Sequence, residues 1–221
     1  MSIDFTGVAA VTIPEGNVTK ITRKSNGAVL WEKSVPEPEE PTINYLEYIQ
    51  NTTNANYVDT GIKPNQNTVL TVTVEALDTL SYRGVGGCRD DSYSFCFFAD
   101  VSTWRADYNK TNSVTTVAVK VGEKIKMTVG AHKFKINDAN QFYYSSAISF
   151  SVSQNIWLLG VNNRGSKMSA MNQKFYSAQI EENGVLLRDY KPAKDPSGTT
   201  CMYESVERKY YYLNGTNANA V

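Results

Sequence analysis

The sequence is poor in the residues that build metal centres and catalytic triads. It contains one histidine, His132, and three cysteines, Cys88, Cys96 and Cys201. A single histidine excludes a His-rich metal site, and any Ser-His-Asp or Cys-His mechanism would depend on that one residue. An odd number of scattered cysteines argues against a disulfide framework and a zinc site, although Cys88 and Cys96 could pair across a hairpin. His132 falls in an alternating segment, so we interpret it as an ordinary strand residue.

The chain also lacks an excess of charge and a long apolar run. Lys+Arg and Asp+Glu both number 22, so the formal net charge is zero. Binding to nucleic acid depends on a basic face that neutralises phosphates, and anionic membranes are disfavoured for the same reason. No apolar run approaches the ~20 residues that span a bilayer, and the first residues do not resemble a signal peptide. We therefore expect no nucleic acid partner, no membrane insertion, and synthesis in the cytoplasm without a signal peptide.

Composition shifts divide the chain into three parts. Residues 1–34 contain two short β-prone runs joined at Asn26-Gly27, a pair that takes the positive φ angles of hairpin turns. So small a unit buries too little surface to be stable alone, so we expect it to be an anchor that needs a partner, which is another copy, the following domain or a larger assembly. Three prolines and neighbouring glutamates make 35–42 a semi-rigid linker. The remainder, 43–221, is long enough for one good core.

Residues 43–221 are rich in β-branched and alternating segments, which favour strands with one buried face. The clearest predicted strands are Thr68–Glu75, Val114–Val121, Lys124–Val129 and His132–Ile136. Turns are predicted at Gly130, at Asn137-Asp138 and at Asn183-Gly184. Many short strands with turn signals between them, and no extended helical periodicity, predict an all-β sandwich.

Two regions of the chain resemble one family of domains. The closing region reads Trp157–Gly165, Lys174–Pro192 and Tyr203–Gly215, and the opening region reads Tyr45–Gln50 and Asn56–Ile62. Together they resemble laminin-G/concanavalin-A-like jelly rolls in tail and surface proteins of phages that infect gut-type bacteria. The resemblance covers roughly 43–221 and implies a jelly-roll sandwich in which Tyr45–Ile49 and Tyr210–Leu213 lie close in one sheet.

Three polar loops concentrate the residue types that bind sugars. Glycine allows close backbone approach, arginine forks to polar groups, and aromatic rings stack on sugar faces. The candidate ligand residues are Arg83, Arg89, Asp90, Asp91, Trp104, Arg105, Tyr108, Asn162, Asn163 and Arg164. The alternative interpretation is that Trp104 fills the core and that the other residues are solvated loop or turn residues.

Metal binding and catalysis find little support. We leave a calcium-binding site open. Asp90, Asp91, Asp100 and Asn162 could supply oxygen ligands, but their spacing does not require an ion. The stretch Asp59-Thr60-Gly61 matches the local pattern of an aspartic protease, which needs two such carboxylates, and only one copy occurs. The paired carboxylates of retaining glucanases are also missing. We therefore predict no catalytic residues, no required cofactor and no enzymatic activity.

The order of anchor, linker and sandwich suits a device that displays a binding domain. With the family resemblance, it predicts a non-enzymatic phage tail or baseplate protein, located on the virion, that recognises a bacterial surface glycan as a receptor-binding or adhesin protein. Its other expected partners are virion subunits, contacted through 1–34, and further copies of itself in a homo-oligomer. The alternatives are a purely structural virion decoration or fibre component without a ligand, and a glycan hydrolase.

Overall fold

The computed structural model describes residues 20–22, 29–32, 42–51, 56–79, 82–100, 102–168, 170–215 and 217–220. The chain divides into two compact units, Met1–Pro41 and Thr42–Val221. In the first unit, β1 (Lys20–Thr22) and β2 (Val29–Glu32) form an antiparallel pair. The turn predicted at Asn26-Gly27 lies outside the described residues, as does the linker predicted at 35–42 except for Thr42.

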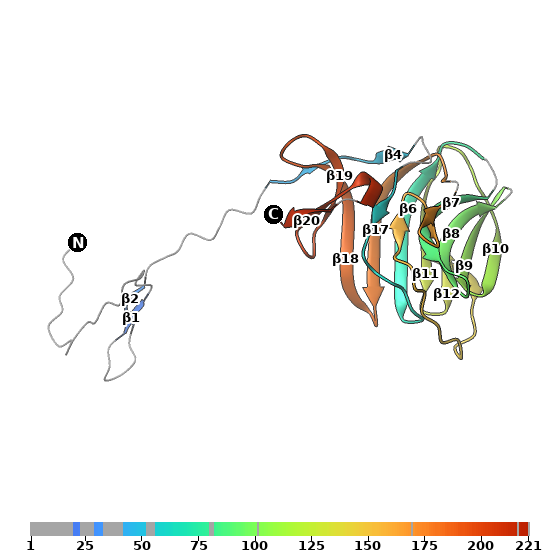
Figure 1. Cartoon of the computed structure of the whole chain (residues 1–221), viewed down its shortest axis with the longest axis horizontal. Coiled ribbons are helices and arrows are strands. Elements are labelled where there is room, and N and C mark those ends of the chain that lie inside the picture. The colour runs from blue at the N-terminus through green and yellow to red at the C-terminus, as the bar shows by residue number, and fades with distance from the viewer. Residues whose placement is uncertain are drawn as a thin grey trace. The chain divides into compact units, whose positions relative to one another are not determined.

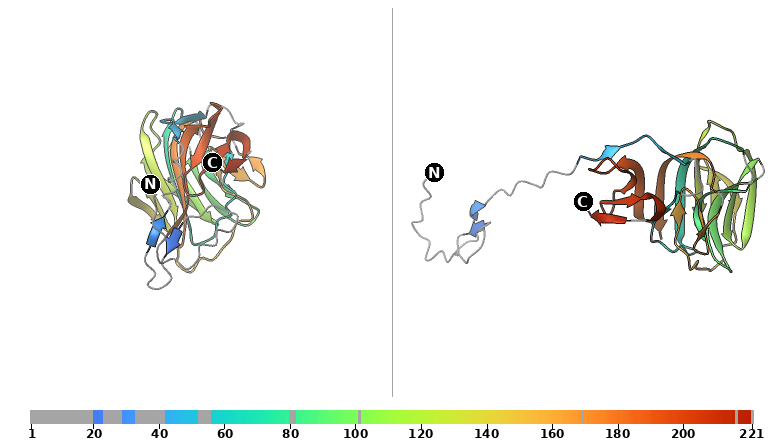
Figure 2. Two further views of the ribbon diagram at one scale, coloured as in Figure 1. Left: turned by 90° about the vertical axis from the view of Figure 1, so that its left-hand side faces the viewer. Right: turned by 45° about the horizontal axis from the view of Figure 1, so that its top comes forward.

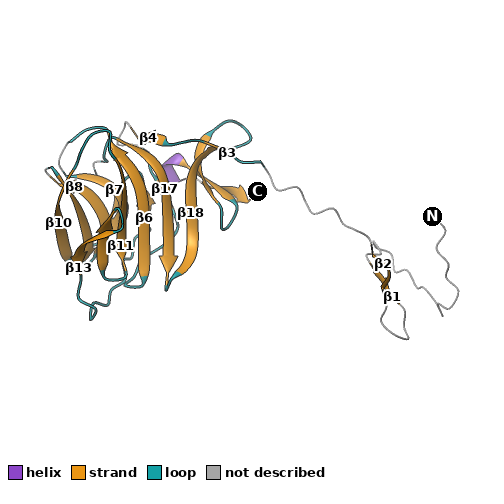
Figure 3. Ribbon diagram, turned by 180° about the vertical axis from the view of Figure 1, so that it is seen from behind, coloured by secondary structure: helices purple, strands orange, loops and turns teal. Residues whose placement is uncertain are grey.

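The second unit is a sandwich of two sheets, which confirms the all-β jelly-roll fold predicted from the sequence (Figure 1). In hydrogen-bonded order, the larger sheet contains β13 (Ala139–Tyr143), β12 (Lys133–Ile136), β11 (Lys124–Gly130), β6 (Thr68–Ala76), β17 (Gln173–Glu182), β18 (Val185–Lys194), β19 (Thr200–Glu204), β20 (Lys209–Tyr212) and β21 (Asn217–Ala220). Outside this order, β3 (Asn44–Tyr45) also pairs with β18, and β4 (Ile49–Asn51) also pairs with β17. Figure 3 shows β18, β17, β6 and β11 side by side.

The smaller sheet covers one face of the larger one. In order, it contains β10 (Thr111–Ala118), β9 (Thr103–Asn109), β8 (Ser94–Asp100), β7 (Arg83–Arg89), β14 (Trp157–Leu158) and β5 (Val58–Asp59). Beside β7, β15 (Val161–Asn163) runs parallel to it and pairs with β16 (Ser166–Lys167). The short 3-10 helix η1 (Leu213–Gly215) follows β20. Both layers can be followed in the further views of Figure 2.

The core lies between the two sheets and follows the alternation of the strands. In β6, Leu70, Val72 and Val74 point inward and are fully buried. From the smaller sheet, Phe97 meets Phe134 of the larger sheet with 6.0 Å between ring centroids. Because successive side chains of a strand point to opposite faces, the residues between these core positions are left for the two outer surfaces.

Two of the three predicted turns are confirmed. Asn183 and Gly184 have φ angles of 52° and 77°, and Asn137 and Asp138 have φ angles of 47° and 67°. The turn predicted at Gly130 is wrong: Gly130 is the last residue of β11, and the turn is formed by Ala131 and His132. A Cβ atom at Gly130 would lie 2.2 Å from the backbone oxygen of Thr68, so close packing accounts for this glycine. His132 is therefore a turn residue and not a strand residue.

The terminal strands share one sheet, as predicted, since β3, β4 and β20 all belong to the larger sheet. They are not neighbours in it, because β18 and β19 lie between β3 and β20. Tyr45 of β3 contacts Tyr203 of β19, with 6.1 Å between ring centroids. The disulfide left open between Cys88 and Cys96 is not formed: both residues are free cysteines, and they belong to different hydrophobic clusters on opposite faces of the smaller sheet. Within the described part of the chain, no helix is long and apolar enough to cross a membrane.

Candidate functional site

The outer face of the smaller sheet carries several of the predicted ligand residues. In β8, Phe95, Phe97 and Ala99 join the main core, whereas Cys96 and Phe98 belong to a separate cluster on the opposite face. Asp100 follows the same alternation, so it shares the outer face with Phe98. The outer face is therefore defined by these positions and by their neighbours in register on β7 and β9.

Four charged side chains run along this outer face: Arg89, Asp100, Arg105 and Asp107, which we call the charged strip. Arg105 holds both oxygens of Asp107, with Nε 2.6 Å from Oδ1 and Nη2 2.9 Å from Oδ2. Its Nη1 atom lies 3.3 Å from Oδ2 of Asp100, and its guanidinium lies 5.6 Å from the ring centroid of Phe98. Burial raises the pKa of Asp107, and the hydrogen bonds from Arg105 oppose that shift. Arg105, Asp107 and Asp100 are thus held in a fixed geometry.

Two buried polar atoms of the charged strip have no hydrogen-bond partner among the residues that the structure describes: Nε of Arg89 and Oδ1 of Asp100. The other end of Arg89 is only weakly engaged, with Nη1 4.0 Å from Sδ of Met168. An unpaired buried donor or acceptor lowers the stability of the fold by about 1–3 kcal/mol, so such atoms are rare and need an explanation. Arg89 Nε is a donor and Asp100 Oδ1 is an acceptor, and hydroxyl groups can form hydrogen bonds with both kinds of atom.

An aromatic pair borders the charged strip on the same face. Trp157 lies opposite Gly87 of β7, and Gly87 lies opposite Cys96 of β8. The ring of Tyr57, which is partly exposed, stacks on Trp157 with 3.8 Å between centroids and 16° between planes. Gly87 has a φ of +117°, and a Cβ atom there would lie 2.2 Å from the backbone oxygen of Phe95. Only glycine fits at this point between the tryptophan and the strip.

Asp90 organises the loop at the end of β7. Its Oδ1 atom accepts hydrogen bonds from the backbone N–H groups of Ser92 and Tyr93, both at 2.8 Å. Its Oδ2 atom accepts from the N–H and the hydroxyl of Ser153, at 2.7 and 3.0 Å. Burial raises the pKa of Asp90, but these hydrogen bonds outweigh it and the net shift is downward. Asp90 is therefore a positioning residue whose oxygens are already occupied.

The neighbouring Asp91 has a different environment. Its Oδ1 atom lies 2.7 Å from Nε of Arg164, and their side chains are 83% and 56% exposed. We call Asp91 and Arg164 the rim pair. The backbone N–H of Arg164 donates to the carbonyl of Arg89 at 3.1 Å, and Asn163 is the register partner of Arg89. The structure thus brings Arg89, Asp91, Asn163 and Arg164 together, as the sequence analysis expected of one ligand surface.

Other predicted ligand residues lie elsewhere. Trp104 and Tyr108 are fully buried in the main core, as the alternative interpretation anticipated for the tryptophan, so neither ring has a free face for a ligand. Asn162 is buried, and its side chain donates to the carbonyl of Asn155 at 3.0 Å and accepts from the N–H of Gly165 at 2.8 Å. Arg83 begins β7 and lies ~20 Å from Arg89 at its other end.

Each residue considered for calcium has at least one side-chain oxygen engaged in another contact, although Oδ1 of Asp100 stays unpaired among the described residues. Asp90 is filled by hydrogen bonds, Asp91 pairs with Arg164, Asp100 pairs with Arg105, and Asn162 fixes a turn. Across the described residues, no group of three or more His, Cys, Asp or Glu side chains could hold a metal ion.

The protease-like stretch is a strand end. Oδ1 of Asp59 accepts from the N–H of Gly61 at 2.9 Å and from the side chain of Asn155 at 3.0 Å. The hydroxyl of Thr60 donates to the carbonyl of Ile156 at 2.8 Å. These contacts join β5 to the segment before β14, so the stretch has a clear structural task.

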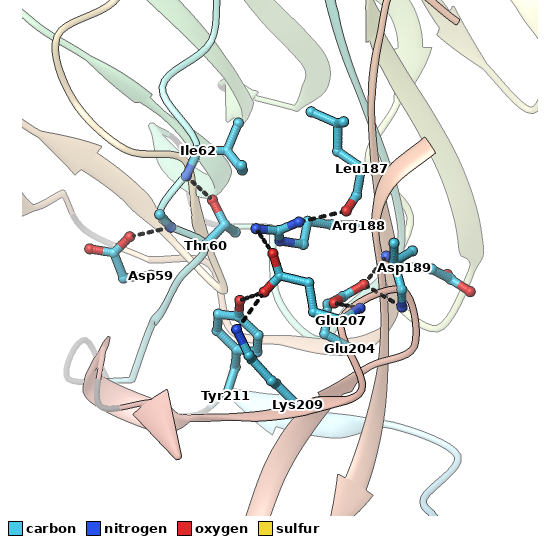
Figure 4. A network of polar contacts seen from close by, with 12 residues as sticks. Asp59, Thr60, Ile62, Leu187, Arg188, Asp189, Glu204, Glu207, Lys209 and Tyr211 are labelled. Carbon is cyan, nitrogen blue, oxygen red and sulfur yellow. Dashed lines mark hydrogen bonds and ion pairs between the residues drawn. The ribbon is translucent and has the colours of Figure 1, made fainter. Parts of the chain in front are cut away.

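A second polar network closes the turn between β19 and β20 (Figure 4). Arg188 Nη2 lies 2.5 Å from Oε1 of Glu207, whose Oε2 accepts from Lys209 at 3.1 Å and from Tyr211 at 3.3 Å. The carboxylate of Glu204, fully buried, accepts three backbone N–H groups at 2.7 to 2.9 Å. With their oxygens satisfied, both glutamates hold the closing strands in place, which explains this part of the sequence without a ligand.

Sequence reasoning missed Asp107 and Trp157 as members of the site. The alternation Trp104-Arg105-Ala106-Asp107-Tyr108 could have shown that Arg105 and Asp107 share a face opposite to the two aromatic residues. Trp157 gave no such signal, because two leucines follow it. A continuous apolar run does not reveal which of its side chains face the core.

Comparison with known proteins supports the fold. No protein-family model matches the chain, and no curated protein matches it. Among solved structures, it is similar to the crystal structure of a candidate carbohydrate-binding protein from Bacteroides ovatus ATCC 8483, with a TM-score of 0.57 and 9% sequence identity. The match covers 82% of this chain and 61% of that one, so this chain spans less than two thirds of that protein. At this identity, the similarity concerns the sandwich architecture alone.

Proposed function

We propose that this protein is a non-enzymatic glycan-binding module whose ligand lies along the outer face of the smaller sheet. The observation that carries the proposal is the pair of buried, unpaired atoms in the charged strip, Arg89 Nε and Asp100 Oδ1. Arg89 lies level with Ser94 at one end of β8, and Asp100 ends that strand ~20 Å away, so the ligand would be a chain of several sugar units, whose hydroxyls both donate and accept. Both atoms are buried, so the sugars would reach them after the side chains that cover them move aside. A site built to hydrogen-bond hydroxyls gains specificity from the cost of leaving its own polar groups unpaired.

The surroundings of the strip fit this ligand class. Tyr57, stacked on Trp157, offers an aromatic surface beside the strip, and aromatic rings with one wet side suit the apolar faces of sugar rings. The rim pair offers an exposed carboxylate and an exposed guanidinium at the end of the same face. Because Asp90 fixes the loop that carries Asp91, little ordering is needed when a ligand binds.

Two features argue against hydrolysis as the function of this face. Both oxygens of Asp107 are taken by Arg105, and its side chain is almost fully buried. Asp100 shares the same guanidinium. A glycosidase needs one carboxylic acid that reaches the leaving oxygen and one carboxylate that reaches the sugar or a water. The absence of reducing-sugar release from bacterial cell walls is the expected result.

We propose further that the glycan belongs to a bacterial surface and that a phage tail or baseplate carries the domain. The virion assignment is supported by the sequence resemblance, and assembly with other subunits and further copies would run through residues 1–34. Single-site affinity is expected to be weak, about millimolar, since many hydroxyls must be desolvated. Several copies on one particle would raise the avidity ~10²–10⁴-fold. The competing proposal is a structural virion component without a ligand.

The test uses the rim pair and a matched control pair. Asp91→Ala/Arg164→Ala removes an exposed ion pair at the proposed site, and Lys126→Ala/Asp138→Ala removes an exposed pair of 2.9 Å on the larger sheet. Each full-length protein is multimerised on beads and applied to an array of bacterial surface polysaccharides. We expect retention of the wild type and the control variant, and loss of retention for the rim variant. Equal retention of all three would contradict the proposed site, and no retention of any would favour the structural alternative.

A further inference from the structure

The outer face of the larger sheet carries a cluster of tyrosines that the sequence analysis did not assign to any site. In register across β3, β18, β19 and β20, one row is Tyr45, Ala193, Cys201 and Tyr212, and the adjacent row is Lys191, Tyr203 and Tyr210. We call Tyr45, Tyr203, Tyr210 and Tyr212, with Lys191, the tyrosine face. The small residues Ala193 and Cys201 are fully buried beneath these rings, so the tyrosines form a continuous aromatic layer.

Ring contacts fix the orientation of this layer. Tyr203 meets Tyr45 edge-on, with 6.1 Å between centroids and 74° between planes, and meets Tyr210 at 5.3 Å. The hydroxyl of Tyr212 donates to Oδ2 of Asp195 at 2.6 Å. All four rings therefore contact a neighbouring side chain.

Tyr45 differs from the other rings of the tyrosine face because it is 49% exposed. Its backbone is nevertheless fixed, since β3 pairs with β18 and the following N–H, of Leu46, donates to the carbonyl of Pro192 at 2.9 Å. The ammonium of Lys191, itself exposed, lies 5.8 Å from the centroid of the Tyr45 ring. The result is a fixed, half-exposed aromatic ring with the ammonium of Lys191 over one of its faces, which leaves the opposite face for a ligand.

We infer that the tyrosine face is a second carbohydrate site, which takes one pyranose ring stacked on Tyr45 with its hydroxyls near Lys191. The inference rests on the proposed glycan-binding function but uses none of the residues of the charged strip or the rim pair. An exposed, preorganised tyrosine offers apolar contact area at a small entropic cost, and its hydroxyl stays in water. The two sites face opposite sides of the sandwich, so one domain would hold two glycan segments and link them.

The two sites can be tested independently. Tyr45→Ala removes the ring, Tyr45→Phe keeps it, and Tyr143→Ala is the matched control, since Tyr143 is 64% exposed on β13. Each full-length variant is titrated with the polysaccharide that best retains the wild type. We expect Tyr45→Ala to weaken binding ~10-fold, and Tyr45→Phe and Tyr143→Ala to bind as the wild type does. Lys191→Ala, at an exposed position, should weaken binding in the same direction and serves if Tyr45→Ala does not fold.

The outcomes separate this inference from the function on which it rests. Wild-type binding by Tyr45→Ala and Lys191→Ala, with loss in Asp91→Ala/Arg164→Ala, overturns the tyrosine site and leaves the charged strip standing. Loss of polysaccharide binding by Tyr45→Ala, with normal binding by the rim variant, supports the tyrosine site and contradicts binding along the charged strip. An equal loss in Tyr143→Ala overturns the inference, because any exposed tyrosine would then have the same effect.

Discussion

Nε of Arg164 lies 2.7 Å from Oδ1 of Asp91, although the two residues belong to loops that are far apart in the sequence. Both side chains are largely exposed, and exposed ion pairs contribute only about 0–1 kcal/mol to stability. We therefore expect Asp91→Ala/Arg164→Ala to change the free energy of unfolding in urea by less than about 1 kcal/mol. A larger loss would mean that the rim pair supports the fold, and its effect on binding would then no longer identify a ligand contact.

Trp104 should behave as a core residue. Only 1% of its surface is exposed, and replacing a buried tryptophan with alanine typically costs about 3–5 kcal/mol. For a domain of this size, that corresponds to a fall in Tm of at least ~6 °C by calorimetry. Tyr143→Ala, at an exposed position, is the control and should leave Tm nearly unchanged. A Trp104→Ala protein with wild-type Tm and impaired glycan binding would restore the sequence-based prediction that this indole touches the ligand.

The pair of Arg105 and Asp107 allows a sharper test of burial. Arg105→Ala would leave the Asp107 carboxylate, whose side chain is 2% exposed, without its counter-charge, at an expected cost of about 3–5 kcal/mol. Replacing both residues by apolar ones, Arg105→Met/Asp107→Leu, should recover most of that loss, because no uncompensated charge remains. Urea unfolding of the two variants gives the comparison. A double variant as unstable as the single one would contradict this account of the pair.

Asp195 should make stability depend on pH in the acid range. The hydroxyl of Tyr212, followed by the hydrogen bonds from Ser197 and Thr199, lowers its pKa from an ordinary value of 3.8 to about 2. A pKa that is lowered in the folded state contributes stability that is present above the unfolded pKa and is lost as pH falls through the folded pKa. We therefore expect Asp195→Asn to lower Tm at pH 6 and the difference from the wild type to shrink between about pH 4 and pH 2. A difference that stays constant over this range would argue against the shifted pKa.

The strands and several turns could be predicted from sequence because their signals are local. β6 follows its β-branched alternation, and the turn at Asn183-Gly184 has the positive φ angles that this pair favours. The turn at Ala131-His132 could not be predicted, since alanine rarely adopts positive φ and the nearby Gly130 gave the stronger signal.

The site was harder to predict because its parts meet only in the folded protein. In β9, alternation separates Trp104 from Arg105, but a stretch taken for a loop gives no reason to apply the alternation of a strand. Asp91 and Arg164 come together because β15 runs parallel to β7, a pairing with no local signal. Sequence reasoning placed Arg89 and Arg105 in loops, which is wrong, because they lie on the strands β7 and β9. It also assigned the aromatic contribution to Trp104 and Tyr108, which are buried, in place of Tyr57 and Trp157.

The central claim is that a glycan binds along the outer face of the smaller sheet, and amide chemical-shift mapping by NMR tests it most directly. The isotope-labelled protein is titrated with an oligosaccharide released from a polysaccharide that retains it. We predict shifts concentrated at Arg89–Ser94, Arg105–Asp107 and Val161–Gly165, with a separate group at Tyr45 and Lys191 if the second site is occupied. Shifts confined to the edge strand β13 or to the β17–β18 turn, with none at Arg89, Asp91 or Arg164, would contradict the account.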